Sequence, residues 1–221
     1  MAVKREKVHF ETVEELLGAP IEKDATTEVR IDQIFPFENH PFKVLDDDKM
    51  EDLVQSIKDN GVLTPVLLRP DDEGTYEMIS GHRRMHAAKL AGLVTIPAII
   101  KPMPNDEATI AMVDANVQRE EILPSERAFS LKMKMDALRR QGSREDLTSR
   151  HDVEKFRESW SSETVGKSMG MGGRQVQRYI RLTELIPEIL DYVDRKRLSM
   201  VLGIEISYFN KELQKWLYEY I

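Results

Sequence analysis

The stretch YEMISGHRRMHAAKLAG, residues 76–92, decides the fold, because an apolar strand pattern changes into a helix pattern at a single glycine within it. Its first five residues mix aromatic and branched side chains, as strands do. The residues after Gly81 are rich in helix formers, and this run ends at Gly92. The pattern therefore predicts a strand, a tight turn and a helix that begins at His82.

Two arginines, Arg83 and Arg84, lie in the first turn of the predicted helix. Backbone N–H groups at a helix N-terminus are unpaired and carry the positive end of the dipole, so this turn is suited to hold an anion. Such junctions are common, however, and arginines there are often only solvated. His82 and His86 have the spacing of a metal-binding pair, but no third ligand follows at a recognisable distance, so no metal site is predicted from them.

Composition excludes several classes of protein. The chain has 221 residues, of which 41% are hydrophobic and 32% charged, and it has no apolar run long enough to span a membrane. The lack of cysteine excludes disulfides, thiolate metal sites and cysteine nucleophiles. The amino end lacks the apolar core of a signal peptide, so a cytoplasmic protein is predicted. The net charge of −7 argues against nonspecific coating of nucleic acid, but it is compatible with a local basic face.

The strand and helix patterns of the amino half predict a small α/β domain over residues 28–104. A flexible arm over residues 1–27, with a short helix near 13–17, is expected to precede it. Strands are expected at residues 27–37, 65–70, 75–80 and 95–100. A helix is expected before Gly61, with Asp48 and Glu51 in a capping box at its start. Its apolar stripe comprises Met50, Leu53, Val54 and Ile57.

From residue 105 onward the pattern is helical. One helix places Ile110, Val113 and Val117 on a single face, and Pro124 opens another. The apolar residues that recur in that second helix are Ala128, Leu131, Met135 and Leu138. The polar stretch 139–162 is predicted to be a flexible loop or a linker between the two halves. The predicted organisation is a helical connector and loop over 105–158 and a helical domain over 159–221, so the fold class is α+β.

The carboxyl-terminal part has the pattern of a helix-turn-helix. Val165 and Met169 are the apolar residues of a short helix, Gly170 lies at the turn, and Val176 and Ile180 give a second helix its buried side together with Tyr179. The second helix of such a motif enters the major groove, where arginine and glutamine match guanine and adenine edges. The candidate DNA-binding residues are Lys167, Arg174, Gln175, Gln177, Arg178 and Arg181. A helical hairpin with a solvated basic face is the alternative.

Four motifs, in order along about residues 28–206, resemble the ParB family of partition proteins. SGHRRMHAAKLAG, from Ser80, resembles the family's arginine box. ANVQREEILPSERA, from Ala115, resembles the next box, which reads Glu-Asn-x-Gln-Arg and later Leu-x-Pro-x-Glu. PFENHPFKV lies upstream, and the helix-turn-helix is followed by LIPEILDYVDRKRLS. The similarity is greatest to partition proteins of plasmids and integrative elements, the ParB/RepB-like type.

The resemblance implies a nucleotide switch. In ParB-like proteins the arginine box cradles the triphosphate of CTP, and DNA at the helix-turn-helix lets two amino domains close as a clamp. The matching CTP-binding positions here are Ser80, Gly81, His82, Arg83, Arg84, Asn116, Gln118 and Arg119. Asn116 would also help to hold Mg²⁺ on the phosphates. The implied partners are a specific double-stranded DNA site, a second copy of the chain and a partition ATPase of the ParA type.

Three residues depart from the family pattern. Phe42 replaces an arginine of the first box, and His82 replaces the acidic residue of the arginine box. Ala115 replaces a glutamate associated with hydrolysis, and Asp114 points elsewhere on the helix, so at most a weak CTPase is expected. The chain also ends at Ile221 without the family's carboxyl-terminal dimerisation domain, so it is expected to be a fragment or to dimerise by another route.

Two other classes of protein stay open at this point. One is a helix-turn-helix transcriptional repressor whose amino domain only dimerises. The other is a kinase-like enzyme, because the family's amino fold is shared with sulfiredoxin-like enzymes and a free-serine kinase. The lack of cysteine removes the sulfiredoxin reaction, and Ala115 removes a candidate acid from the kinase reading.

Overall fold

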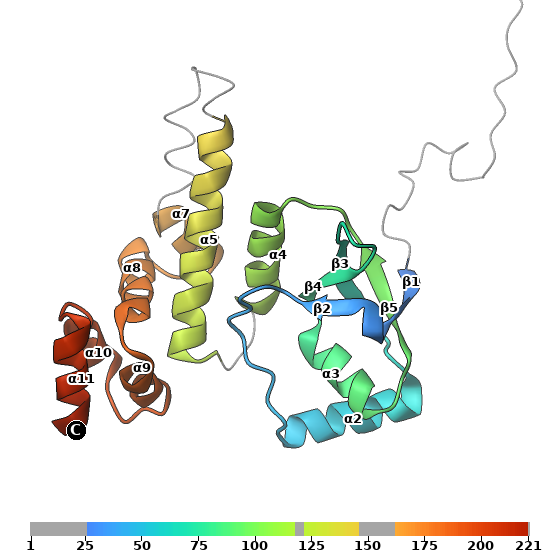
Figure 1. The fold of residues 1–221 in the computed structure, drawn as a ribbon, viewed down its shortest axis with the longest axis horizontal. Coiled ribbons are helices and arrows are strands. Elements are labelled where there is room, and N and C mark those ends of the chain that lie inside the picture. Colours follow the sequence, from blue (N-terminus) through green and yellow to red (C-terminus); the bar gives the residue numbers. More distant parts are fainter. Residues whose placement is uncertain (1–25, 118–121, 146–161, 221) are drawn as a thin grey trace, which may run out of the picture.

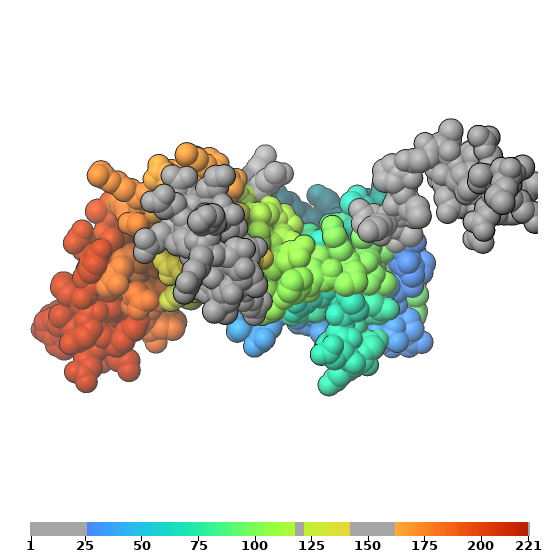
Figure 2. All heavy atoms as spheres, turned by 90° about the horizontal axis from the view of Figure 1, so that it is seen from above, coloured from blue at the N-terminus to red at the C-terminus, as the bar shows by residue number. Residues whose placement is uncertain are grey.

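The computed structural model describes residues 26–117, 122–145 and 162–220. The expected arm, apart from its last two residues, and the helix near 13–17 lie outside the described residues. Figure 1 shows a lobe built on a sheet, a long central helix and a group of shorter helices, arranged in that order along the long axis of the molecule. The view from above in Figure 2 shows the same order. No helix in the described parts is long and apolar enough to cross a membrane.

The sheet is mixed and has five strands in the order β1-β5-β3-β4-β2. Strands β3 and β4 form an antiparallel hairpin, β5 runs parallel to β3, and the short edge strand β2 runs parallel to β4. The other edge strand, β1, is antiparallel to β5. The bounds are β1 Thr26–Arg30, β2 Ile34–Pro36, β3 Val66–Pro70, β4 Tyr76–Ser80 and β5 Thr95–Ile100.

Three of the expected strands are confirmed within one residue, and the single strand expected at 27–37 is wrong. A 3-10 turn, Ile31–Gln33, divides that segment into β1 and β2. The turn buries Ile31, whose backbone N–H donates to the carbonyl of Val94 at 3.0 Å. Because of this break, β1 pairs with β5 at one edge of the sheet and β2 pairs with β4 at the opposite edge.

Two helices accompany the strands in this lobe, α2 (Asp48–Asn60) and α3 (His82–Leu90). The expected apolar stripe of α2 is confirmed, since Met50 and Ile57 are buried against Ala87 of α3. The expected capping box is wrong by one residue. Asp47 caps the helix, and its side chain accepts the backbone N–H of Met50 at 2.9 Å.

Helix α4 (Asn105–Val117) packs against the sheet lobe, and its buried side is not centred where the sequence predicted. Met112 and Val113 are fully buried beside Ile79 of β4, whereas Ile110 is only partly buried. Positions 108, 109, 112, 113 and 116 share the buried face. Small and polar residues form part of this face, so the spacing of the large apolar residues alone did not locate it.

Helix α5 (Pro124–Glu145) is the central helix of Figure 1 and contacts both α4 and α8. Its predicted stripe is confirmed by the burial of Ala128, Leu131 and Met135. The start of the predicted loop at 139–145 is wrong, because α5 continues through these residues. Their good helix formers, such as Arg139 and Arg140, outweigh the lack of an apolar stripe. Residues 146–161 of that loop lie outside the described residues.

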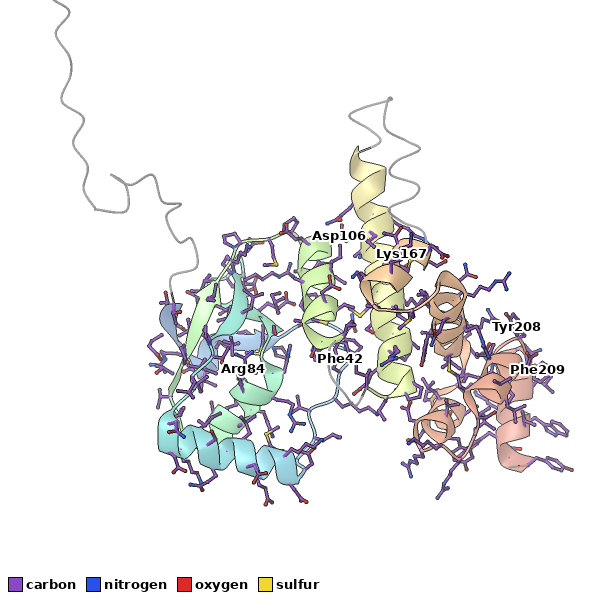
Figure 3. All side chains as sticks on the ribbon, turned by 180° about the vertical axis from the view of Figure 1, so that it is seen from behind. Phe42, Arg84, Asp106, Lys167, Tyr208 and Phe209 are labelled. Carbon is purple, nitrogen blue, oxygen red and sulfur yellow. The ribbon has the colours of Figure 1, made fainter. Side chains whose placement is uncertain are left out.

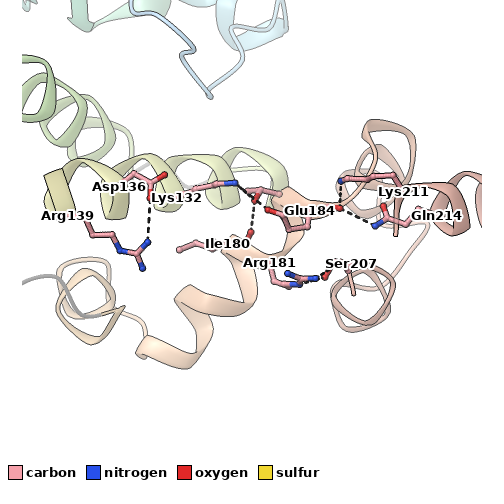
Figure 4. Close-up of polar contacts among 10 residues, drawn as sticks. Lys132, Asp136, Arg139, Ile180, Arg181, Glu184, Ser207, Lys211 and Gln214 are labelled. Carbon is pink, nitrogen blue, oxygen red and sulfur yellow. Dashed lines mark hydrogen bonds and ion pairs between the residues drawn. The ribbon is translucent and has the colours of Figure 1, made fainter. Parts of the chain in front are cut away.

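The remaining helices form a bundle against the far side of α5. They are α7 Ser162–Ser168, α8 Gly173–Arg181, α9 Pro187–Asp194, α10 Met200–Ile206 and α11 Lys211–Tyr220. A fully buried glutamine, Gln214, fixes α11 to this bundle. Its side chain accepts the N–H of Ile186 at 2.8 Å and donates to the carbonyl of Phe209 at 2.9 Å. It also donates to the carbonyl of Glu184 at 3.2 Å (Figure 4). The fold is thus α+β, as predicted: a mixed-sheet domain followed by a helical region.

Candidate functional site

The turn between β4 and α3 can be made only by glycine. Gly81 has a φ of 108°, a conformation that other residues rarely adopt. A Cβ atom at this position would also lie 2.6 Å from Cγ1 of Val66, which is buried in β3. The strand end at Ser80 and the first turn of α3 are therefore held together tightly. Gly81 contributes no side-chain cap to α3, so the N-terminal backbone of this helix is available to an outside acceptor.

Arg83 faces the loop before α2 and pairs with a carboxylate there. One of its terminal nitrogens lies 3.0 Å from Oδ1 of Asp47. Hydrogen bonding from the guanidinium is the main cause that lowers the pKa of Asp47 below its ordinary value. One turn further along α3, Nε2 of His86 lies 2.7 Å from Oδ1 of Asp46. Two adjacent carboxylates from the loop before α2 therefore face this side of α3.

Arg84 has a different environment. It donates to the backbone carbonyls of Thr64 and Pro65, both at 2.6 Å, and burial lowers its pKa from the ordinary value. These carbonyls belong to the segment between α2 and β3. Figure 3 shows Arg84 inside the sheet lobe. Arg83 and Arg84 are adjacent in sequence, but only Arg83 is paired with an acidic side chain.

His82 and Phe42, two of the residues that depart from the family pattern, meet in one aromatic cluster. The His82 ring lies 3.7 Å from that of His40, measured between centroids, and His40 meets Phe42 edge-on at 5.5 Å. His82 and Phe42 are 6% and 3% exposed. Packed rings thus stand where the family pattern has charged residues. Sequence reasoning missed His40, whose place beside His82 depends on a contact between residues 42 positions apart.

Asn116 lies near the end of α4 and is buried, with an exposed fraction of 5%. Its side-chain amide donates to the carbonyl of Met112 at 2.8 Å, which leaves the side-chain oxygen as the only atom suited to a cation. No group of three acidic or histidine side chains in the described parts could hold a metal. Asn116 therefore fits Mg²⁺ only as one ligand of an ion held mainly by phosphates. Gln118 and Arg119 lie outside the described residues.

The second candidate site is the pair of short helices α7 and α8, for which the sequence predicts a helix-turn-helix. Its turn is confirmed at Gly170, which has a φ of 67°. A second glycine, Gly166, brings the turn against α7, because a Cβ there would lie 2.4 Å from the carbonyl oxygen of Met171. The buried side of α8 is also confirmed, with Val176 fully buried beside Leu131 of α5.

Five of the six candidate DNA-binding residues are exposed on this motif: Lys167, Arg174, Gln175, Gln177 and Arg178. Gln177 also donates to Oγ of Ser162 at 3.1 Å, so it is partly engaged within the motif. Figure 3 shows Lys167 and Arg84 on opposite sides of α4, so the two candidate sites are separate.

Arg181, the sixth candidate, is only partly exposed and has partners inside the chain. It donates to Oγ and to the backbone carbonyl of Ser207 at 3.0 and 2.6 Å. Its guanidinium lies 4.2 Å from the centroid of the Tyr208 ring. Figure 4 shows that the contacts with Ser207 turn Arg181 toward the end of α10. Arg181 therefore has a structural role that its place on the helix pattern did not reveal.

A groove of about 500 Å³ lies beside α8, on the side that faces α5. Its charged lining comprises Lys132 and Arg139 of α5, Arg181 of α8, and Glu184 (Figure 4). Lys132 lies 3.5 Å from Glu184, and Arg139 lies 3.7 Å from Asp136. Basic side chains of α5 thus lie next to the exposed basic side chains of α8, across this groove.

Comparison with known proteins gives the family. Residues 17–117 match the ParB N-terminal domain. A probable chromosome-partitioning protein ParB of Coxiella burnetii is 30% identical over 181 residues, which are 80% of this chain and 55% of that protein. A nucleoid occlusion protein of Geobacillus thermodenitrificans is 28% identical over 190 residues, 86% of this chain and 60% of that protein. The chain belongs to the ParB family, as the four motifs predicted, and it spans about half the length of these relatives.

A solved structure supports the fold. The C-terminally truncated chromosome-partitioning protein ParB of Caulobacter crescentus, complexed to the centromeric parS site, has a TM-score of 0.51 and 24% sequence identity. The match covers 87% of this chain and 91% of that one. It shows that the sheet lobe and the helical region follow one another in both proteins. The plasmid and integrative-element type remains a prediction.

Proposed function

We propose that this chain is a sequence-specific DNA-binding partition protein that acts in DNA segregation. The observation that carries the proposal is the exposed face of α8, where Arg174, Gln175 and Arg178 follow the glycine turn while Val176 anchors the helix. Arginine and glutamine in this position match base edges in the major groove. The Caulobacter relative with the same fold is bound to a centromeric DNA site.

The amino lobe is proposed to bind CTP with Mg²⁺ and to act as the switch of a DNA clamp. Gly81 lets α3 begin directly at the end of β4, and Arg83 is half-buried in its first turn. A bound triphosphate would replace the carboxylate of Asp47 as the partner of Arg83, because phosphate oxygens form strong charge-assisted hydrogen bonds with arginine. Ser80 and Arg84 would line the same turn. Gln118 and Arg119 are proposed for the facing wall from the family resemblance.

The proposed partners follow from the family. They are a specific DNA duplex, a second copy of the chain and a partition ATPase of the ParA type, and the proposed location is the bacterial cytoplasm, on nucleoid or plasmid DNA. The proposed boundaries are an arm over 1–27, a nucleotide-binding domain over 28–104, a connector over 105–158 and a DNA-binding domain over 159–221. Hydrolysis of CTP is proposed to be weak, because Ala115 leaves an exposed methyl group where the family has a glutamate.

Selection of bound duplexes from a random pool tests the DNA proposal. We expect enrichment of one motif, and loss of that enrichment when Arg174 and Gln175 are both replaced by alanine. Calorimetric titration with CTP and Mg²⁺, with and without the selected duplex, tests the nucleotide proposal. A chain that is fused to a dimerising segment and still enriches no motif would refute DNA specificity. Absence of heat with CTP in both titrations would refute the nucleotide switch alone.

A repressor without a nucleotide switch is the second candidate, and one observation favours it. Phe42 is buried in the core and His82 is stacked on His40, so two positions that are charged in the family pattern are closed by rings. The titrations above separate the candidates, because a repressor of this kind enriches a DNA motif but does not respond to CTP.

A further inference from the structure

Lys134 is a buried lysine that belongs to neither candidate site. It lies in the middle of α5, and only 5% of its surface is exposed. Its ammonium group forms an ion pair with Asp114 of α4 and donates to Oγ of Ser168, at the end of α7, at 3.2 Å. One charged atom therefore joins three helices.

The environment of this ammonium makes both contacts important. A buried charge is costly unless it is paired and hydrogen-bonded, so Lys134 cannot lose its partners without a penalty. Asp114 is half exposed, so its carboxylate can shift with α4 and stay hydrated, whereas the buried ammonium must follow it to stay paired. Ser168 is held in turn, since its hydroxyl donates to the carbonyl of Val165 at 2.8 Å. Of the two partners of Lys134, the carboxylate of Asp114 is therefore the one that can move, and the hydroxyl of Ser168 is the one held in place.

The two partners of Lys134 belong to the elements that carry the candidate sites. Asp114 lies two residues before Asn116, where α4 leads to Gln118 and Arg119. Ser168 follows Lys167 and is the last residue of α7 before the turn that positions α8. A displacement of the end of α4 would therefore pull on the ammonium, and the ammonium would pull on the helix-turn-helix.

We propose that Lys134 is a positioning residue that couples the end of α4 to the helix-turn-helix, so that a ligand bound at either place changes affinity at the other. The inference rests on the proposed function, because it concerns the CTP and DNA sites proposed above. Coupling of this kind is reciprocal, and it shows as the same ratio of affinities measured from either side.

The test measures this ratio in three proteins. CTP with Mg²⁺ is titrated into the chain alone and into the chain saturated with its selected duplex, and the ratio of the two dissociation constants is the coupling. We expect a ratio of at least about 5 in the unchanged chain, which is the lower end of typical allosteric coupling. In Lys134→Met the ratio falls to within about twofold of 1, because the apolar side chain fills the same space without bonding to either helix. Lys58→Met, which removes an exposed lysine from the last turn of α2, keeps the ratio.

A second variant guards against a folding defect. Ser168→Ala removes the contact to α7 and leaves the ammonium paired with Asp114, so the chain is expected to fold, and the ratio is expected to fall. An unchanged ratio in both Lys134→Met and Ser168→Ala, or a ratio of 1 in the unchanged chain, would overturn the inference and leave the separate CTP and DNA sites standing. Absence of CTP binding in the unchanged chain would instead remove the proposed nucleotide site, and the inference with it.

Discussion

A single carboxylate oxygen of Asp47 accepts hydrogen bonds both from Arg83 and from the backbone at the start of α2. Oδ1 of Asp47 lies 3.0 Å from a guanidinium nitrogen of Arg83 and also accepts the backbone N–H of Met50 at 2.9 Å. The cap of one helix is therefore also the counter-charge of the candidate cradle at the start of another. An anion that binds Arg83 must compete with this carboxylate.

Asp47→Asn is expected to tighten the binding of CTP. Asparagine caps a helix about as well as aspartate, so α2 keeps its start, but the neutral amide no longer competes for Arg83. Because the pair is partly exposed, its removal is expected to raise the affinity for CTP only a few-fold. Titration calorimetry measures the change. Asp48→Asn is the control, since it removes a charge from the same turn of α2 and keeps the pair between Asp47 and Arg83. Weaker binding by Asp47→Asn would show that the carboxylate helps the nucleotide rather than competing with it.

The same pair predicts how stability depends on pH. The pKa of Asp47 is lowered in the folded chain, mainly by Arg83, from an ordinary value of 3.8. A group with a lowered folded pKa stabilises the fold fully above its unfolded pKa and loses this effect as the pH falls through the folded pKa. The stability difference between the chain and Asp47→Asn should therefore be constant near neutral pH and shrink below about pH 4. Urea unfolding from pH 7 to pH 3 measures it, and a constant difference over that range contradicts the prediction.

Arg83→Ala should weaken the binding of CTP with Mg²⁺ by about 1.5–3 kcal/mol, as expected for the loss of a hydrogen bond to a charged group. Its fold should be little changed, because the ion pair to Asp47 is partly exposed. Arg84→Ala is the comparison, since it leaves two backbone carbonyls without their donor and should lower the free energy of unfolding. Unchanged titration heat for Arg83→Ala would remove Arg83 from the cradle.

Ala115→Glu should raise the release of phosphate from CTP, if the acid that the family places there is what hydrolysis lacks. Ala115 is exposed on α4, so the longer side chain can be accommodated without disturbing the core. A phosphate assay with the selected duplex present compares the two chains. Ala111→Glu, one turn earlier and partly buried, is the control for added charge on the same helix. Brisk turnover by the unchanged chain would show that another residue supplies the acid.

The sequence predicted the parts of the fold that depend on neighbouring residues. The aromatic and branched residues of 75–80, the glycine at 81 and the helix formers after it are enough to predict a strand, a turn and a helix from local sequence. The 3-10 turn at Ile31–Gln33 could not be foreseen in this way, because its stabilising partner is the carbonyl of Val94. Local pattern thus located the elements but not the contacts between distant ones.

The same limit applies to the candidate sites. Arg83 and Arg84 look equivalent in the sequence, but one meets the carboxylate of Asp47 and the other meets backbone carbonyls near residue 64. Arg181 has the helical position of an exposed cation, and Ser207 captures it. Lys134 has the sequence pattern of a polar position of α5, but it is buried and its ammonium group contacts Asp114 and Ser168. Each of these side chains is assigned its role by a residue at least 20 positions away.

The difference between Arg174 and Arg181 gives the last prediction. Arg174 is exposed at the start of α8, where a recognition helix meets base edges, so Arg174→Ala should cost about 1–3 kcal/mol on the selected duplex and little on other sequences. Gln175→Ala should act in the same way. Binding isotherms on the selected duplex and on a scrambled one measure the loss of preference.

Arg181→Ala should behave differently, because Arg181 is bonded to Ser207 and stacked on Tyr208. If it also reaches a phosphate, its loss weakens all duplexes alike and reduces the magnitude of the salt slope by about 1. Ser207→Ala separates the two roles, since it removes one hydrogen bond of Arg181 and leaves the guanidinium charge in place. A lower unfolding temperature for Arg181→Ala with an unchanged salt slope assigns Arg181 to the packing of α8 against α10. A reduced slope for Arg181→Ala, with the slope of Ser207→Ala unchanged, assigns it to the DNA backbone.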